Sequence, residues 1–94
     1  MAYLITHFYD GGNAGQYQAA IAAVHPPAGL PAGQVYHAAG PCDGGWLIAS
    51  VWDSKASCDR FVTETLLPTL PTVEGGFAGP PHERAAEVAY LITA

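Results

Sequence analysis

Four histidines are the residues of this chain best suited to acid–base chemistry. His7 and His37 fall within segments that we predict to be β-strands, and an imidazole there can act as an acid, a base or a ligand near neutral pH. The simpler alternative for both is a buried histidine that is hydrogen-bonded for structural reasons alone. His25 precedes a proline at the predicted end of a helix, where a positive charge is favourable, so we expect a capping role. His82 lies in a predicted loop, where it is solvated or covers a pocket.

Four aromatic residues are the candidates for contact with a ligand. Tyr36 and Tyr90 could orient a phenol or a quinone through their hydroxyl groups, although tyrosines also pack in sheets without any such role. Trp46 and Trp52 suit the wall of a pocket for a flat apolar molecule, and they suit an ordinary dimer core equally well. The sequence has no catalytic-triad pattern, phosphate-binding glycine loop or metal-ligand spacing, so we predict neither a metal nor a bound cofactor.

The charge balance excludes two classes of partner. Three basic residues stand against eight acidic ones and leave a formal net charge of −5. Nucleic-acid binding needs a cluster of cations to neutralise phosphates, and an anionic membrane surface needs one too. We therefore expect neither nucleic acid nor a membrane as a partner.

The length and the two cysteines bear on the number of domains and on the compartment. The chain has 94 residues, which predicts one domain over residues 1–94. No apolar run approaches the roughly 18 residues of a membrane span, and the N-terminus lacks the features of a signal peptide. Cys42 and Cys58 have no zinc-type spacing and fit two free thiols, although the sequence leaves a disulfide open. We expect a cytoplasmic protein.

The first half of the chain predicts a strand, a helix and a hairpin. Residues 2–9 are rich in β-branched and aromatic types and end at an Asp-Gly-Gly turn. Apolar residues at helical spacing, with Asn13 as a cap, predict a helix over 14–24 that stops before two prolines. Residues 34–40 and 46–52 predict two strands joined by a turn that contains Asp-Gly.

The second half predicts one helix and one strand. Ser54 caps a helix whose inner face carries Cys58, Phe61, Val62, Thr65 and Leu66, and Pro68 ends or bends it. Residues 69–85 are rich in proline and glycine and predict a loop. Residues 86–93 predict the last strand, with Val88, Tyr90 and Ile92 on one face.

This β-α-β-β-α-β order predicts an α+β, ferredoxin-like fold with one antiparallel sheet and two helices on one face. Two helices cover only one face of a sheet. The strand at 46–52 is apolar on both faces, whichever of its two sets of side chains points to the helices. A contiguous exposed apolar patch of that size seldom stays uncovered. We therefore predict a homodimer in which two sheets pack together around an apolar cavity.

The segment Trp46-Leu-Ile-Ala-Ser-Val-Trp52-Asp53-Ser54, which runs into a helix with Phe61, resembles the antibiotic-biosynthesis-monooxygenase-like domains of the dimeric α/β-barrel superfamily. The resemblance spans almost the whole chain and implies a pair of ferredoxin-like subunits. Members include cofactor-free quinone-forming monooxygenases and haem-degrading oxygenases. Trp52 matches the Trp that lines the pocket in the haem-degrading members, and His7 stands where they have an Asn.

The resemblance also has gaps. The haem-degrading members ligate haem through a histidine on the second helix, and residues 55–67 contain none, so haem binding and degradation are not expected here. Haem binding without turnover through His7 or His37 stays open. Arg60 and Arg84 fall outside the positions at which polyketide-type members use an arginine.

The leading hypothesis is a cofactor-independent monooxygenase-like protein that binds a flat, apolar phenol or quinone-like molecule. His7 or His37 would deprotonate the substrate, and the resulting anion would react with oxygen directly. The strand pairing favours His7, on the same side as Trp52, whereas His37 is expected to face the helices. The alternative is a non-catalytic small-ligand-binding or structural homodimer.

Overall fold

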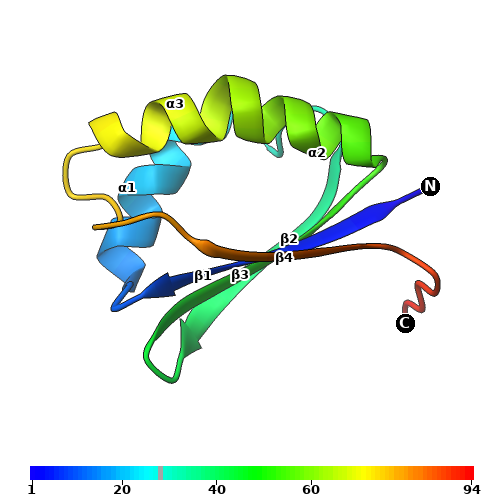
Figure 1. Ribbon diagram of the computed structural model, residues 1–94, viewed down its shortest axis with the longest axis horizontal. Coiled ribbons are helices and arrows are strands. Elements are labelled where there is room, and N and C mark those ends of the chain that lie inside the picture. The colour runs from blue at the N-terminus through cyan, green and yellow to red at the C-terminus, as the bar shows by residue number, and fades with distance from the viewer. Residues whose placement is uncertain (28) are drawn as a thin grey trace.

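A computed structural model describes residues 1–27 and 29–94, and its elements follow the predicted order. The strands are β1 (Tyr3–Asp10), β2 (Gln34–Cys42), β3 (Gly45–Trp52) and β4 (His82–Glu87). The helices are α1 (Ala14–Val24), α2 (Lys55–Phe61) and α3 (Leu67–Thr69). A π-helical turn over Val62–Leu66 joins α2 to α3, and a 3₁₀ turn over Leu70–Thr72 follows. These four elements form one continuous segment, which we call the helical arm (Figure 1).

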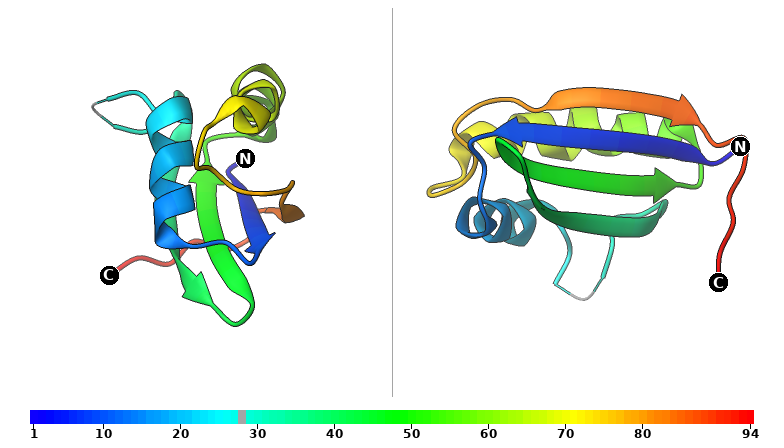
Figure 2. Two further views of the ribbon diagram at one scale, coloured as in Figure 1. Left: turned by 90° about the vertical axis from the view of Figure 1, so that its left-hand side faces the viewer. Right: turned by 90° about the horizontal axis from the view of Figure 1, so that it is seen from below.

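The four strands form one antiparallel sheet in the order β2-β3-β1-β4. Both α1 and the helical arm lie over the same face of this sheet, which leaves its other face without a helix (Figures 1 and 2). We call the covered face the inner face and the other the outer face. The predicted ferredoxin-like α+β fold is confirmed.

Two predicted caps fix where the helices begin. The Asn13 side chain accepts a hydrogen bond from the backbone N–H of Gln16 at 2.9 Å. The Ser54 hydroxyl oxygen accepts one from the backbone N–H of Ser57 at 3.1 Å. Each cap satisfies an N–H that has no partner within its own helix. The helix predicted over residues 14–24 has those bounds in the structure.

The inner face carries the core. Ile5, His7 and Tyr9 alternate with more exposed residues along β1, and on β3 the buried set is Trp46, Ile48, Ser50 and Trp52. Of the two face assignments that the sequence left open for β3, the structure therefore has the tryptophans toward the helices. Leu47, Ala49 and Val51 lie on the outer face. An apolar cavity accordingly lies between the sheet and the helices of one chain. The predicted cavity between the sheets of two chains stays a prediction.

The last strand differs most from the prediction. β4 covers His82–Glu87, four residues earlier than expected, and residues 88–94 form no strand. Residue 82 is therefore in the sheet, whereas a loop was predicted there. Antiparallel pairing with β1 determines the bounds of β4, because it aligns Glu87 with Tyr3 and His82 with Phe8. Backbone pairing with β1 outweighs the higher strand propensity of the apolar residues that follow.

Pro68, at which the sequence predicted an end or a bend, lies within the continuous helical arm. It has no N–H to bond the carbonyl of Glu64, and one residue earlier the N–H of Leu67 reaches back five residues to the carbonyl of Val62. This wide turn holds Leu66 buried against the sheet. π-helical turns are rare and frequently lie at functional sites.

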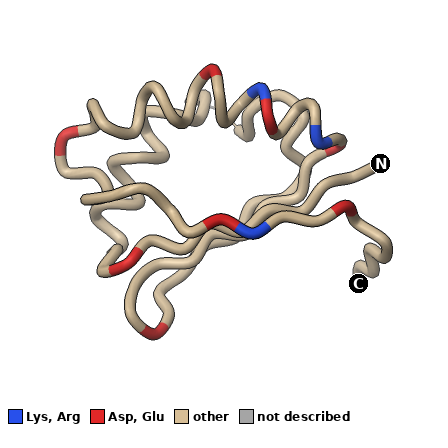
Figure 3. The backbone as a smooth tube through the Cα atoms, in the orientation of Figure 1, with Lys and Arg blue, Asp and Glu red and all other residues tan. Residues whose placement is uncertain are grey.

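The charged residues are scattered over the molecule. Lys55 and Arg60 lie on α2, and Arg84, the remaining basic residue, lies on β4 (Figure 3). Lys55 pairs with Asp59 at 2.6 Å on the exposed side of the helix. Among the described helices, none is long and apolar enough to cross a membrane.

Candidate functional site

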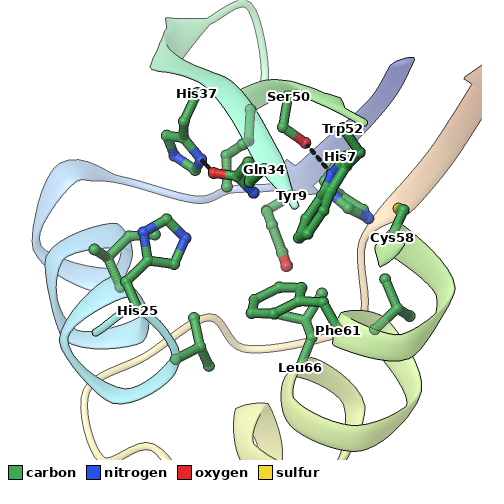
Figure 4. A pocket seen from close by; sticks show the side chains of 14 residues that line it. His7, Tyr9, His25, Gln34, His37, Ser50, Trp52, Cys58, Phe61 and Leu66 are labelled. Carbon is green, nitrogen blue, oxygen red and sulfur yellow. Dashed lines mark hydrogen bonds between the residues drawn. The ribbon is translucent and has the colours of Figure 1, made fainter. Parts of the chain in front are cut away.

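A small cavity lies between the inner face of the sheet and the helices (Figure 4). Its volume is about 40 Å³. Apolar side chains from α1 and the helical arm form its roof, including Ile21, Val24, Phe61 and Leu66. Its floor on the sheet carries polar groups: His7, Gln34, His37 and Ser50. Few polar groups in an apolar lining are typical of a small-molecule site.

His7 is held by a carboxylate. Its Nε2 lies 3.0 Å from Oε2 of Glu83 on the adjacent strand β4, because the sheet register places residues 7 and 83 side by side. An ionised carboxylate only accepts hydrogen bonds, so Nε2 of the neutral ring carries the proton and Nδ1 is the acceptor. His7 is 7% exposed. A buried imidazole oriented by a carboxylate is the arrangement of a general base.

His37 has partners at both ring nitrogens. Nδ1 lies 3.1 Å from Oε1 of Gln34, a carbonyl oxygen that accepts, so Nδ1 donates. Nε2 lies 2.6 Å from the hydroxyl of Tyr17 and accepts a hydrogen bond from it. Burial raises the pKa of the Tyr17 hydroxyl, which keeps it protonated as this bond requires. Because both nitrogens are engaged, His37 is a less available base than His7.

A β-bulge makes the bond between Gln34 and His37 possible. Residues three apart on a regular strand point to opposite faces. The pairing of β2 with β3 shifts between Gln34 and Tyr36, so Gln34 is opposite Trp52 and His37 is opposite Ser50. Both partners belong to the inner face. The extra residue, Val35, therefore brings Gln34 and His37 to the same side, as bulges beside functional sites commonly do.

His25 also faces the cavity. It ends α1, where its backbone N–H bonds the carbonyl of Ile21, and its ring meets that of His37 edge-on at 4.9 Å between centroids. Burial first, and then the nearby His37, lower the pKa of His25. Burial first, and then His7, lower the pKa of His37. His25 is the C-cap residue of α1, as predicted, and its lowered pKa disfavours a positive charge on the ring.

Tyr9 and Trp52 complete the aromatic part of the wall. Tyr9 is stacked on Phe77 with 3.7 Å between ring centroids, and burial, with a contribution from Glu83, raises its pKa to about 12. Trp52 donates its indole N–H to the hydroxyl of Ser50 at 3.1 Å and packs on Phe61. Neither side chain carries charge at neutral pH.

The structure brings together three of the six predicted site residues. His7, His37 and Trp52 line the cavity. Trp46 is buried on the same face but packs against Tyr17 at one side, with 5.2 Å between ring centroids. Tyr36 points to the outer face and is half exposed, and Tyr90 is 89% exposed beyond the end of β4. Neither of these two tyrosines reaches the cavity of its own chain. His37 faces the helices, as expected. His7 and Trp52 also face the helices, whereas they were expected on the opposite side from His37.

Sequence reasoning missed four polar residues of this region, which are Tyr17, His25, Gln34 and Glu83. Tyr17 was considered only as one of the apolar residues at helical spacing in the helix predicted over residues 14–24, and Glu83 lay in a predicted loop. One signal was available: His25 and Tyr17 lie on the same helix as Ile21 and Val24, at spacings that share its buried face. Gln34 gave no signal, because its position depends on the bulge.

The cavity has no metal-binding geometry in the described part of the chain, where no three His, Cys, Asp or Glu side chains converge. Cys58 lines the cavity as a buried free thiol, and burial raises its pKa to about 11. It is therefore a neutral apolar wall residue at physiological pH.

Comparison with known proteins supports the fold. No family model and no curated protein matches the sequence. A solved structure is similar over nearly the whole chain, the "putative Antibiotic biosynthesis monooxygenase from Chloroflexus aurantiacus J-10-fl", with a TM-score of 0.66 and 15% identity over 99% of this chain and 98% of that one. The chain therefore shares its ferredoxin-like fold with that protein, which agrees with the fold that the resemblance implied. Identity this low shows the fold and leaves function to the site.

Proposed function

We propose that this protein is a cofactor-independent monooxygenase that binds a flat, apolar phenol in the cavity between sheet and helices. The observation that carries the proposal is the buried His7, whose Nε2 is held by Glu83 on the wall of an apolar cavity. The acceptor nitrogen, Nδ1, takes the phenolic proton, and the carboxylate of Glu83 stabilises the imidazolium that forms. The fold shared with a monooxygenase-like protein is consistent with this chemistry.

The reaction balances without a flavin or a metal. The phenolate transfers electrons to O₂, and a new C–O bond forms at the ring carbon para to the oxygen. That carbon loses its hydrogen and becomes the second carbonyl of a quinone, and the other oxygen atom leaves as water. The phenol supplies all four electrons that reduce O₂. The dry wall formed by Trp52 and Phe61 favours the delocalised anion over a hydrated one.

The small cavity volume supports a second candidate function, a non-catalytic binding or structural dimer. An apolar cavity of about 150 Å³ is needed to hold benzene, whereas this one has about 40 Å³ and room for a few water molecules. A phenol therefore enters only if the helical arm moves away from the sheet. The π-helical turn at Val62–Leu66, which carries two of the roof residues, is where we propose that this movement occurs.

We also propose that the protein is a homodimer formed through the outer face. Leu4, Val35, Tyr36 and Leu47 are each between 38% and 50% exposed on that side of the sheet or at its edge. Covering them with the same face of a second copy is the simplest closed arrangement. A cytoplasmic location fits the two free thiols, Cys42 and Cys58.

Oxygen uptake tests the function. Phenols and hydroquinones are incubated with the protein under air, and quinone formation is followed by absorbance. We expect His7→Ala to abolish turnover and Glu83→Gln, which keeps a hydrogen-bonding group but loses the charge, to reduce kcat about 100-fold or more. His82→Ala is the matched control, because His82 forms a similar pair with Asp10 at 2.6 Å on the exposed surface, and it should leave turnover unchanged. Binding of a phenol without any oxygen uptake would favour the non-catalytic alternative.

A further inference from the structure

The C-terminal segment after β4 is an apolar segment without a partner. Residues 88–94 form no strand, and Tyr90 and Ile92 are 89% and 91% exposed. The chain leaves the sheet after Glu87 and turns to the side opposite the helices (Figure 1). Large apolar side chains gathered on one short segment in this way mark a contact with another surface.

The sequence of this segment is that of a strand. Residues 89–93, Ala-Tyr-Leu-Ile-Thr, repeat residues 2–6 without a change. Residues 3–6 of the first copy form the N-terminal half of β1, which pairs with β3 on one side and with β4 on the other. Its Ile5 is 3% exposed. The same five residues are therefore compatible with a sheet, and the second copy lacks only a strand to pair with.

A free strand edge is available on β4. In the order β2-β3-β1-β4 this strand has a neighbour on one side alone, and all six of its residues are exposed. The segment is unsuited to fold back on its own β4, because Val88-Ala89 lacks the Gly, Asn or Asp that a tight hairpin turn requires. Instead the N–H of Val88 bonds the carbonyl of Ala2 at 2.9 Å, and the chain then turns away from β4 (Figure 1).

We infer that residues 88–93 form a fifth strand on the free edge of β4 in a second copy of this chain. The two copies exchange segments, so that each sheet gains five backbone-paired residues and each exposed edge is covered. The inference rests on the proposed homodimer and adds to it. A strand there places alternate side chains on the inner face beside Glu83 and Ala85. Since Tyr90 and Ile92 alternate with Leu91, an apolar side chain of the partner closes that side of the His7–Glu83 pair in either register.

Hydrogen exchange on the full-length chain tests the inference separately from the dimer. At concentrations where light scattering shows a dimer, we expect the amides of residues 89–93 to exchange about 100-fold or more slowly than in a free peptide. Leu91→Pro removes an N–H from a segment that is irregular in the single chain, and should restore fast exchange and weaken the dimer about tenfold or more. Ile92→Lys should weaken it too. Leu67→Lys, a change of an exposed apolar residue on α3, is the control and should alter neither property.

Each other outcome overturns the inference in a distinct way. A stable dimer whose residues 89–93 exchange at the free rate leaves the homodimer standing and removes the strand exchange. Slow exchange in a monomer would mean that the segment pairs within its own chain. A monomer with fast exchange at all concentrations would overturn both proposals. Fast exchange in the Leu91→Pro variant with an unweakened dimer would show that the strand does not contribute to association.

Discussion

Two of the histidines around the cavity, His25 and His37, are shifted toward the neutral form by burial. His25 and His37 each have a lowered pKa, first because burial disfavours the charged ring and then because another histidine is near. Glu83, by contrast, stands beside His7 and supplies the negative charge on that side of the cavity. The cavity therefore has a carboxylate beside His7 on one side and two histidines with lowered pKa values on the other.

The lowered pKa values of His25 and His37 predict that the folded protein loses stability in acid. A histidine with a lowered pKa in the folded protein binds fewer protons than in the unfolded chain, whose value is 6.5. Stability is therefore intact above that value and is lost as pH falls from it toward the lower folded values. We expect the midpoint of urea unfolding to decrease between pH 7.5 and pH 5.5, and to decrease less in His25→Asn and in His37→Asn.

The pH range of the expected loss of stability distinguishes the histidines from the carboxylates. The pKa of Asp53 is lowered, mainly by a hydrogen bond with the Ser57 side chain. Protonation of Asp53 therefore reduces stability only at pH values below 3.8, the ordinary pKa of this carboxyl group. His82→Asn, a change of an exposed histidine, is the control and should keep the full decrease. An unchanged decrease in both cavity variants would show that other groups cause the acid sensitivity.

At the scale of elements, two local features of the strands position the site. The bulge at Val35 turns Gln34 and His37 to the same face. The hairpin that joins β2 to β3 brings Gly45 against β1, where it pairs with Asp10 and where an added Cβ would collide with the carbonyl oxygen of Tyr9. Tyr9 lines the cavity, so the close packing of the Gly45 backbone against the Tyr9 backbone helps to position a residue of the site.

Gly45→Ala should therefore destabilise the protein. The colliding atom belongs to the backbone of β1 and cannot rotate away, so the strands must separate at the end that carries Tyr9. We expect a loss of about 3 kcal/mol in the free energy of unfolding. Gly40→Ala on β2 is the matched control, because an added Cβ there meets nothing within 4 Å. Chemical denaturation of both variants measures the difference, and equal stabilities would show that the strands accommodate the methyl group.

At the scale of the whole molecule, the sheet is covered on one face only. The outer face carries apolar residues at Leu4, Leu47 and Val35, whereas Arg84 and Thr6 are the polar residues near its β4 edge. A single layer of helices on one sheet is half of a closed structure. The proposed dimer supplies the other half, and the exchanged C-terminal strand extends the contact to the β4 edge.

A charge placed on the outer face tests this dimer. Leu47→Asp should shift the protein from dimer to monomer, because a buried unpaired carboxylate is costly at an apolar interface. The subunit should stay folded, since Leu47 is 41% exposed in the single chain. Leu67→Asp, at 53% exposure on α3, should leave the dimer intact. Light scattering and circular dichroism follow the two properties, and a Leu47→Asp dimer as stable as the parent would contradict the face-to-face arrangement.

Local signals in the sequence determined the order of the elements and most of their bounds. Asn13 and the two prolines after His25 fix α1 at both ends, because a cap and a missing N–H act within a few residues of where they stand. The same holds for Ser54 and for the hairpin at Asp43-Gly44. β4 is the exception, since local signals favoured residues 86–93, whereas pairing with β1 selects residues 82–87.

The site itself was decided by tertiary structure. The sequence singled out His7, His37 and Trp52 by residue type and strand position, yet it could not give the face of β3 or the reversal of alternation at Val35. It also could not bring Glu83 to His7, which is 76 residues away in the chain. Side chains alternate with a period of two along a strand, so a single residue of register or bulge moves a group from solvent to cavity. That register is set by backbone pairing between distant strands, and local sequence carries no record of it.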